Sequence, residues 1–279
     1  MSIQPKEQFN LIIEANRPGK HYWADIWRYR DLFYFLVWRD ILVRYKQTVI
    51  GVAWVVIRPI TTMLVFTLVF GKLAKLPSDG VPYSLMVFTG MLPWFFFSSA
   101  LSESSNSMVT NSNLLSKVYF PRIIVPTSAI IVCLVDFLLS FLVLVPFMVY
   151  YGISPTWKIF TVPLFLILAV MASLGFGLWL AALNVKYRDF RFILPFIVQI
   201  GLYVSPVGFS SNIVPEKWRL LYSLNPMVGV IDGFRWALLG GNFHLYLPGL
   251  YASILLTLVI FVTGLGYFRS TERTFADLL

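Results

Sequence analysis

Long runs of apolar residues recur along the chain from about position 48 to position 268 and dominate its pattern. A helix needs roughly 20 apolar residues to cross a bilayer core about 30 Å thick, because lipid cannot hydrogen-bond an exposed backbone. Runs of this length predict six membrane-spanning helices, at Thr48–Phe70, Tyr83–Leu101, Ile123–Tyr150, Ile159–Asn184, Phe192–Phe209 and Leu245–Phe268. We therefore expect an all-α integral membrane protein.

A seventh apolar stretch, Leu220–Leu239, is broken by polar residues, proline and glycine, at Asn225, Pro226, Asp232, Gly233 and Arg235. We expect a re-entrant or interfacial segment here, at about 210–240, just before the last span. Broken helices at membrane depth are tolerated only where protein or a water-filled cavity covers the freed backbone. The outer face of a translocation path and a buried structural hairpin both meet this condition.

Composition agrees with a membrane domain, since 58% of the residues are hydrophobic and only 13% are charged. The net charge of +9 could suggest nucleic acid, but in a membrane protein the distribution of Lys and Arg matters more. Most of these residues fall on the side of the two termini, which predicts that both termini are cytoplasmic. The opening is polar, so no secretory signal is expected. We predict a cytoplasmic segment 1–47, a membrane domain 48–268 and a cytoplasmic tail 269–279.

Metal and disulfide chemistry have little support. The single cysteine, Cys133, lies in an apolar run, where we expect it to pack as a small hydrophobic residue. The two histidines, His21 and His244, are far apart and lack the spacing of metal ligands. The sequence predicts no metal site.

The segment His21–Lys46, which precedes the first span, mixes many aromatic residues with arginines. Such a mixture suits a helix in the headgroup layer, with its rings at the boundary and its guanidinium groups toward anionic lipid. Its amphipathic pattern is imperfect, and a bend is predicted near Asp31. A surface anchor and a docking platform for a partner both fit this segment.

Three ionisable residues, Arg58, Glu103 and Asp136, fall within apolar runs. A charge at the centre of a membrane helix costs on the order of 3 kcal/mol, so these side chains should face protein or water. An ion pair between Asp136 and Arg58 is one arrangement to test, and a structural polar contact is favoured over a proton relay. The polar tract Ser98–Asn113 either continues into the cytoplasm or lines a wet interior.

The connection after the second span, LLSKVYFPRIIVP, places several apolar residues in a cytoplasmic loop: Leu114, Leu115, Val118, Tyr119 and Phe120. An exposed apolar patch usually marks a partner site. A short helix packed on its own bundle is the alternative. The sequence also lacks G-x-x-x-x-G-K-[ST], H-E-x-x-H and G-x-S-x-G, so any energy for uphill transport must come from outside this chain.

Five segments together resemble the permease family of ABC-2-type polysaccharide exporters, which includes O-antigen, teichoic-acid and capsule export subunits. They are RDILVRYKQTVIGVAWVVIRP (39–59), NSNLLSKVYFPRIIVP (111–126), LNVKYRDFRFILPFIVQIGLYVSPVGF (183–209), LNPMVGVIDGFRWALLG (224–240) and ERTFADLL (272–279). One departure is Arg58, where the family pattern favours a neutral residue.

The resemblance implies a homodimer with six spans per subunit, an N-terminal interface helix and two copies of a separate subunit that binds ATP and magnesium. This chain would then bind no cofactor itself. The cargo would be a lipid-linked polysaccharide crossing the cytoplasmic (inner) membrane.

The resemblance also implies two contacts with the ATP-binding subunit. The main coupling helix corresponds to Asn113, Leu114, Leu115, Lys117, Tyr119, Phe120, Pro121 and Arg122, and a shorter loop contributes Tyr187, Arg188 and Asp189. The first, second and fifth spans would border the path, with candidate lining residues Trp54, Arg58, Trp94, Phe95, Phe96, Phe97 and Tyr203.

Two other functional classes stay open from the residues alone. A membrane-embedded glycosyltransferase acting on a lipid-linked sugar would use Glu103, Asp136 or Asp232, gathered at one membrane face. An ion channel or proton-coupled carrier would line a pore with paired charges. A stable ATPase partner would favour the exporter over both.

Overall fold

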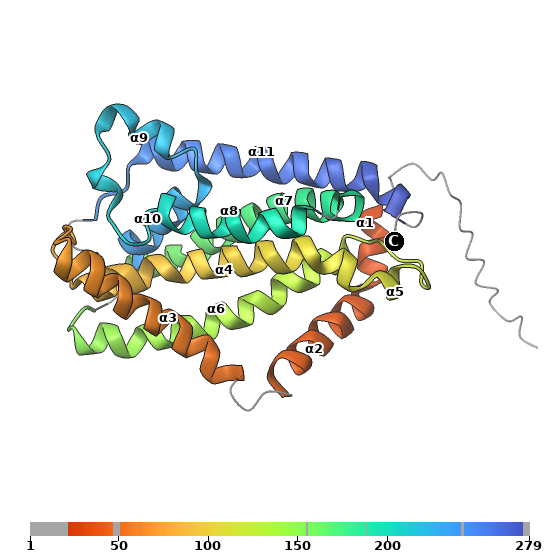
Figure 1. The fold of residues 1–279 in the computed structure, drawn as a ribbon, viewed down its shortest axis with the longest axis horizontal. Helices are drawn as coiled ribbons and strands as arrows, with labels where there is room; N and C mark the ends of the chain where they lie inside the picture. Colours follow the sequence, from red (N-terminus) through yellow and green to blue (C-terminus); the bar gives the residue numbers. More distant parts are fainter. Residues whose placement is uncertain (1–21, 47–50, 155, 188, 241–242, 276–279) are drawn as a thin grey trace, which may run out of the picture.

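The computed structural model describes residues 22–46, 51–154, 156–187, 189–240 and 243–275, and these form an elongated bundle of helices (Figure 1). No strand occurs in the described part of the chain. The α-helices are α1 (Tyr22–Arg28), α2 (Arg30–Lys46), α3 (Gly51–Phe66), α4 (Tyr83–Thr110), α5 (Ser112–Leu115), α6 (Ile124–Tyr150), α7 (Val162–Lys186), α8 (Phe190–Val204), α9 (Glu216–Tyr222), α10 (Pro226–Leu238) and α11 (Leu247–Thr271). The ends of the bundle are called the α5 end and the α9 end below.

Five helical segments are long and apolar enough to cross a membrane: Ala53–Leu73, Tyr83–Thr110, Ile124–Tyr150, Trp157–Lys186 and Leu247–Thr271. The first of these combines α3 with a π-helical stretch, Thr67–Leu73, that continues it. The fifth predicted span, Phe192–Phe209, is only partly helical, because α8 ends at Val204 and the residues up to Phe209 form turns. With 15 residues, α8 is about 22 Å long, shorter than a bilayer core.

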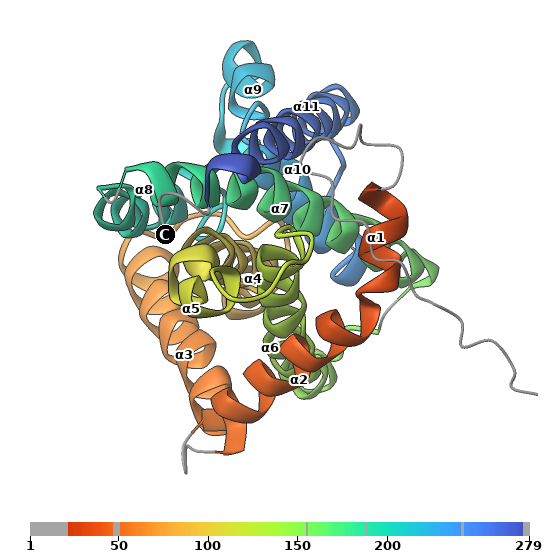
Figure 2. The same cartoon turned by 90° about the vertical axis from the view of Figure 1, so that its right-hand side faces the viewer.

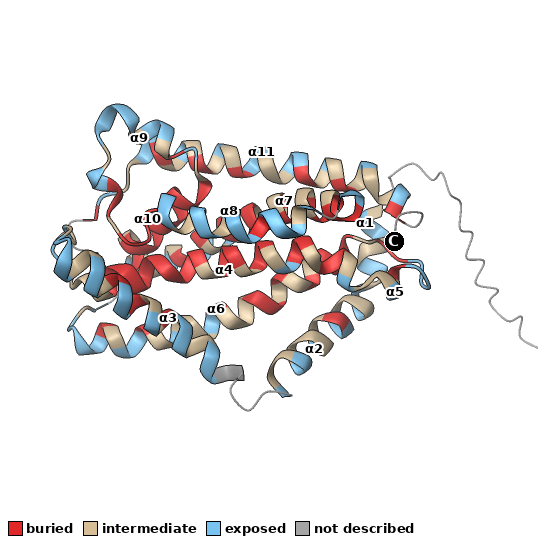
Figure 3. Ribbon diagram, viewed as in Figure 1, coloured by how far each residue is buried: buried red, intermediate tan, exposed pale blue. Residues whose placement is uncertain are grey.

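The central element is α4, which contacts α3, α6, α7, α8 and α10 and is buried along most of its length (Figures 2 and 3). It extends to Thr110 rather than ending near Leu101, so the polar tract continues the helix instead of leaving it. Most of its buried hydroxyls bond to carbonyls of the same helix, as when Ser107 donates to Ser104 O at 2.7 Å, although the hydroxyl of Ser104 itself has no partner among the described residues. Serine is therefore tolerated inside the bundle because its donor is satisfied locally.

Small residues allow α7 and α11 to approach closely. A Cβ on Gly175 would lie 2.8 Å from the backbone of Phe261, and one on Gly264 would meet the carbonyl oxygen of Gly175. Gly177 packs in the same way against Ser104 of α4. Small residues thus permit close helix packing at these positions, whereas Gly266 faces open space.

The N-terminal segment forms two helices that meet at Tyr29, close to the bend predicted near Asp31. Helix α2 packs against α6 and buries Leu36. Most of its aromatic side chains stay exposed, among them Tyr34, Phe35 and Trp38. An interfacial location accounts for this exposure, because such rings are stable at the level of the lipid headgroups.

The broken apolar stretch before the last span forms the short exposed helix α9 and the buried helix α10. Asn225 caps α10 by accepting from the amide of Met227 at 3.0 Å. Helix α10 packs against α4, α7 and α11 and buries nearly every residue, so it is part of the protein core rather than an interfacial helix. The free carbonyls of the turn after α8 are bound by Arg235, which is fully buried and donates to Val207 O and Phe209 O, both at 2.8 Å.

Candidate functional site

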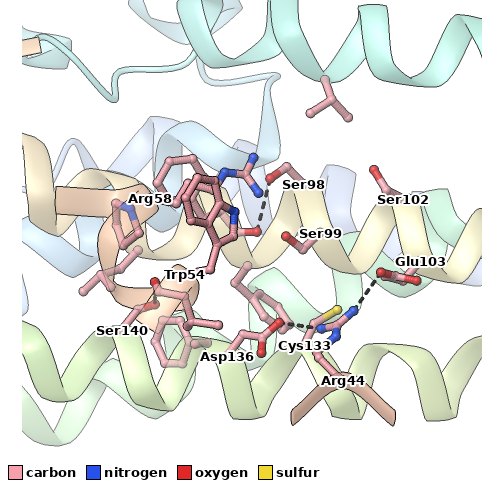
Figure 4. A pocket seen from close by; sticks show the side chains of 17 residues that line it. Arg44, Trp54, Arg58, Ser98, Ser99, Ser102, Glu103, Cys133, Asp136 and Ser140 are labelled. Atoms are coloured by element: carbon pink, nitrogen blue, oxygen red, sulfur yellow. Dashed lines mark hydrogen bonds and ion pairs between the residues drawn. The ribbon is translucent and has the colours of Figure 1, made fainter. Parts of the chain in front are cut away.

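A cavity of about 740 Å³ opens between α3, α4 and α6, with single contributions from α2 and α8 (Figure 4). The lining residues are Trp54, Val55, Arg58 and Pro59 from α3; Leu92, Phe95, Phe96, Ser98, Ser99, Ser102 and Glu103 from α4; Cys133, Asp136, Phe137 and Ser140 from α6; and Arg44 and Val198. They recur every three or four residues, as expected for one face of each helix. The wall combines aromatic rings, hydroxyls and charges.

The serines on this wall differ in how far they are satisfied. Ser98 donates to Phe95 O at 3.1 Å. Ser99 and Ser102 donate no side-chain hydrogen bond within the described residues and face the cavity. Their hydroxyls are therefore available to a polar ligand, while Trp54, which is 61% exposed, offers a large flat apolar surface.

Arg44 carries the main charge contacts of the cavity. Its guanidinium binds Glu103 at 2.7 Å and Asp136 at 2.5 Å (Figure 4). The hydroxyl of Tyr45 also donates to Asp136. The ion pair considered between Asp136 and Arg58 is not formed. Arg44 replaces Arg58 because α2 packs on α6 and brings its last turn beside Asp136.

Sequence reasoning placed Arg44 in the headgroup layer and missed this role. The one available signal was that a carboxylate deep in an apolar run requires a cation. The choice between two arginines depends on how α2 packs, which the local pattern does not contain.

Arg58 lies on the same face of α3 as Trp54, four residues earlier, and its side chain extends toward Ser98 (Figure 4). Its guanidinium lies over the ring of Phe95, 5.0 Å from the centroid. Within the described part of the chain, Arg58 forms no ion pair. A cation–π contact stabilises the charge only partly, so Arg58 keeps donors for another group.

A second cavity of about 290 Å³ adjoins the first toward the α5 end. Both are lined by Arg44 and Glu103, so this ion pair stands between them. Arg39 lines the second cavity, where it pairs with Asp40 at 2.7 Å and donates to Asn111 at 3.0 Å. The two cavities thus lie one after the other between the α5 end and the centre of the bundle, with this ion pair between them.

The seven candidate path residues divide into two groups. Trp54, Arg58, Phe95 and Phe96 line the cavity. The others do not: Trp94 and Phe97 are buried in the core, Phe97 against Phe176, and Tyr203 is exposed on α8 with its ring stacked on Phe66.

The connection between α4 and α6 is only partly exposed. Leu115 and Phe120 are 5% and 3% exposed and belong to the core of the α5 end, and Pro121 is also buried. The expectation that Leu115 and Phe120 present an exposed apolar patch is therefore wrong, since they anchor the loop. Its exposed surface is formed instead by Lys117, Val118 and Tyr119, with Tyr119 69% exposed; Asn113 is exposed beside it, and Leu114 and Arg122 are half-buried.

Glu272 fixes this connection to both ends of the described chain. Its carboxylate accepts from the Arg122 amide at 2.7 Å and from the Tyr22 hydroxyl at 3.1 Å, while the Arg122 guanidinium donates to the Glu272 carbonyl. Burial raises the pKa of the Glu272 carboxyl, and the two hydrogen bonds to the carboxylate partly offset this. The loop that joins α4 to α6 thus rests on a framework made by α1 and the end of α11.

The other predicted contact, between α7 and α8, lies at the same end of the bundle (Figure 1). Tyr187 and Asp189 are exposed there. Arg188 lies outside the described residues.

The carboxylates required by the glycosyltransferase alternative are separated. Glu103 and Asp136 share Arg44, whereas Asp232 lies on α10 beside a small pocket with Arg219 and Tyr222. No group of three His, Cys, Asp or Glu residues placed to hold a metal occurs in the residues that the structure describes. Paired charges do lie around Arg44, and such pairs are the feature expected of a proton-coupled carrier. This cluster is therefore compatible with a carrier as well as with an exporter.

These features define a multi-pass membrane protein with a polar cavity among its helices and no nucleotide-binding motif in its sequence. Residues 31–239 match the family model described as ABC-2 type transporter, and the chain belongs to this family of transport permeases.

Several curated proteins are similar to the chain over most of its length. It is 28% identical to the O-antigen export system permease protein RfbA of Klebsiella pneumoniae, with 89% of this chain and 95% of the relative covered. It is 30% identical to the protein of the same name from Myxococcus xanthus, covering 76% and 81%. The polysialic acid transport protein KpsM of Escherichia coli is 23% identical, covering 84% and 91%.

Proposed function

We propose that the chain is the membrane subunit of an exporter that moves a lipid-linked polysaccharide, of the O-antigen type, across the cytoplasmic membrane. The observation that supports this most is the cavity, where the ring of Trp54 and the free hydroxyls of Ser99 and Ser102 face one another across α3 and α4. A flat apolar ring suits the face of a sugar, and hydroxyls suit its polar edge. The names of the relatives agree with this class of cargo.

The proposed orientation places the α5 end, and with it both termini, in the cytoplasm. Lys117, Arg122 and Lys186 lie at this end, as the positive-inside rule requires. Helix α8 would complete a sixth crossing together with the turn after Val204, whose backbone carbonyls are bound by Arg235 and so tolerate the membrane interior. Two copies of the chain would enclose the path, and two ATP-binding subunits would dock at the α5 end.

The coupling step follows from chain connectivity. The loop 111–123 joins α4 to α6, and these two helices supply most of the cavity wall. A partner bound at Val118 and Tyr119 that moves on binding ATP would shift both helices as rigid bodies. The exposed Tyr187 and Asp189 would give a second contact, toward α7 and α8.

The proposal is tested by purifying the tagged chain from its native membrane, where it should retain a stoichiometric ATPase. Reconstituted together, the two should export glycan with ATP when an ionophore has collapsed the proton gradient. Transport that needs the proton gradient and not the ATPase would instead establish a proton-coupled carrier. The charges around Arg44 would then serve proton coupling.

A further inference from the structure

We propose that Arg58 is an anion-recognition site within the cavity, which binds a carboxylate or phosphate group of the exported molecule. This inference rests on the proposed function and specifies its cargo as an anionic one. It depends on a contrast among the arginines that line the two cavities.

The other two arginines that line the two cavities are paired with carboxylates of this chain. Arg39 pairs with Asp40, and Arg44 pairs with both Glu103 and Asp136. Arg58 has only the ring of Phe95 and no acid among the described residues. Residues 47–50, which precede α3 in the sequence, are QTVI and contain no acid.

The position of Arg58 within the first span carries a free-energy cost for its charge. It lies five residues inside the first span, or about 7.5 Å along the helix axis. A charge at membrane depth is costly unless water or a partner meets it, and such residues mark ligand and ion pathways. Because Arg58 lines the cavity, its charge is met by water or by a molecule inside the cavity, and it is open to an anionic ligand there.

The surroundings of Arg58 favour a planar, oxygen-rich anion attached to a sugar. A guanidinium binds carboxylate or phosphate oxygens through two parallel hydrogen bonds. Trp54 lies one helical turn away on the same face, and the free hydroxyls of Ser99 and Ser102 lie on the opposite wall. A sugar ring on Trp54 would therefore place a substituent near Arg58.

The charges around Arg44 restrict the binding of an anion in the cavity to the site at Arg58. Arg44 with its two acids has a net charge of −1, so an anion is repelled there and attracted only at Arg58. The site would therefore bind one charged group of the cargo transiently and would not hold a polyanion along its length. Weak binding of this kind suits a path that must release its cargo.

The test uses the full-length chain in nanodiscs of phosphatidylcholine, which has no net charge, and matched soluble probes. Binding of hexagalacturonate is compared with binding of its methyl ester, and binding of geranyl diphosphate with that of geraniol. The wild type should prefer the charged probe by roughly tenfold in at least one pair, the gain expected from one charge-assisted contact. Preference in the uronate pair assigns the site to the glycan, and preference in the diphosphate pair assigns it to the lipid carrier.

In R58Q the preference should vanish, and in R58K it should persist in weaker form. R191Q, which removes an exposed arginine outside the cavity, should leave it unchanged. Equal affinity for charged and neutral probes in the wild type, or an unchanged preference in R58Q protein that elutes as a folded species, overturns the proposal.

Failure here differs from failure of the proposed function. A chain that exports glycan with its ATPase but shows no charge preference refutes the anion site alone. A chain without an ATPase partner refutes the exporter, and binding of the charged and neutral probes to the chain alone can still be compared.

Discussion

The broken segment at the α9 end and the central cavity differ in how their polar groups are bonded. At the α9 end, Arg235 is 0% exposed and donates to three backbone carbonyls, so the broken segment is fixed within the core. In the cavity between α3, α4 and α6, by contrast, Arg58, Ser99 and Ser102 face open space. Polar groups are satisfied where the chain must stay rigid and left available where it meets other molecules.

The largest predicted effect is at the rigid end. R235M would leave the carbonyls of Val207 and Phe209 without the side-chain donor that binds them, at about 1–3 kcal/mol each. Since net stability is small, we expect little folded protein, measured as the monodisperse fraction in size-exclusion chromatography. K217Q, at an exposed position of α9, is the matched control and should behave as wild type. Normal recovery of folded R235M would contradict the distinction between the bonded polar groups of the α9 end and the available ones of the cavity.

The second prediction contrasts two neighbours in the loop. Y119D should abolish partner-stimulated ATP hydrolysis and export while leaving the thermal midpoint within a few degrees of wild type, because Tyr119 is exposed. F120D should instead destabilise the chain by several kcal/mol, because it places a charge in the core of the α5 end. Both are measured by thermal unfolding of the purified chain and by ATPase assays of the complex. Full coupling in Y119D would contradict the docking role of this surface.

The smallest predicted effect concerns pH. Burial raises the pKa of Glu272 in the folded state, so its proton is held more tightly there than in the unfolded chain. The stability that this contributes is complete below the unfolded pKa, near 4.5, and is lost as pH rises through the higher folded value. Thermal stability of the wild type should therefore fall relative to E272Q as the pH rises above 4.5.

The control for this pH effect is E216Q, which alters an exposed carboxylate of α9 and should track the wild type across the range. A stability difference between wild type and E272Q that stays constant with pH would show that burial of Glu272 does not govern its titration.

How much of this could be predicted from the sequence depends on whether the determinant is local. Hydropathy located the long helices, because lipid imposes its requirement on each segment separately. The end of α4 was misplaced since Ser104, Ser105 and Ser107 look like solvent-exposed residues, although neighbouring helices cover them.

The site was harder to predict than the fold. Trp54 and Phe95, two of the seven candidate path residues, line the cavity, but whether Trp94 or Phe95 faces it depends on the rotation of α4. The partner of Asp136 and the inward direction of Leu115 and Phe120 result from packing between distant segments. Single-sequence patterns do not contain this information.

The central claim is that the exported glycan passes along the cavity between α3, α4 and α6. The most direct measurement replaces Trp54 with a photoreactive benzoylphenylalanine in cells that make the glycan, with the partner's ATP hydrolysis blocked. The matched control places the same residue at Leu142, which is exposed on α6 and does not line the cavity. We predict glycan adducts at position 54 and none at position 142. Adducts at both positions alike, or none at position 54 in a variant that exports normally once ATP hydrolysis is restored, would contradict the account.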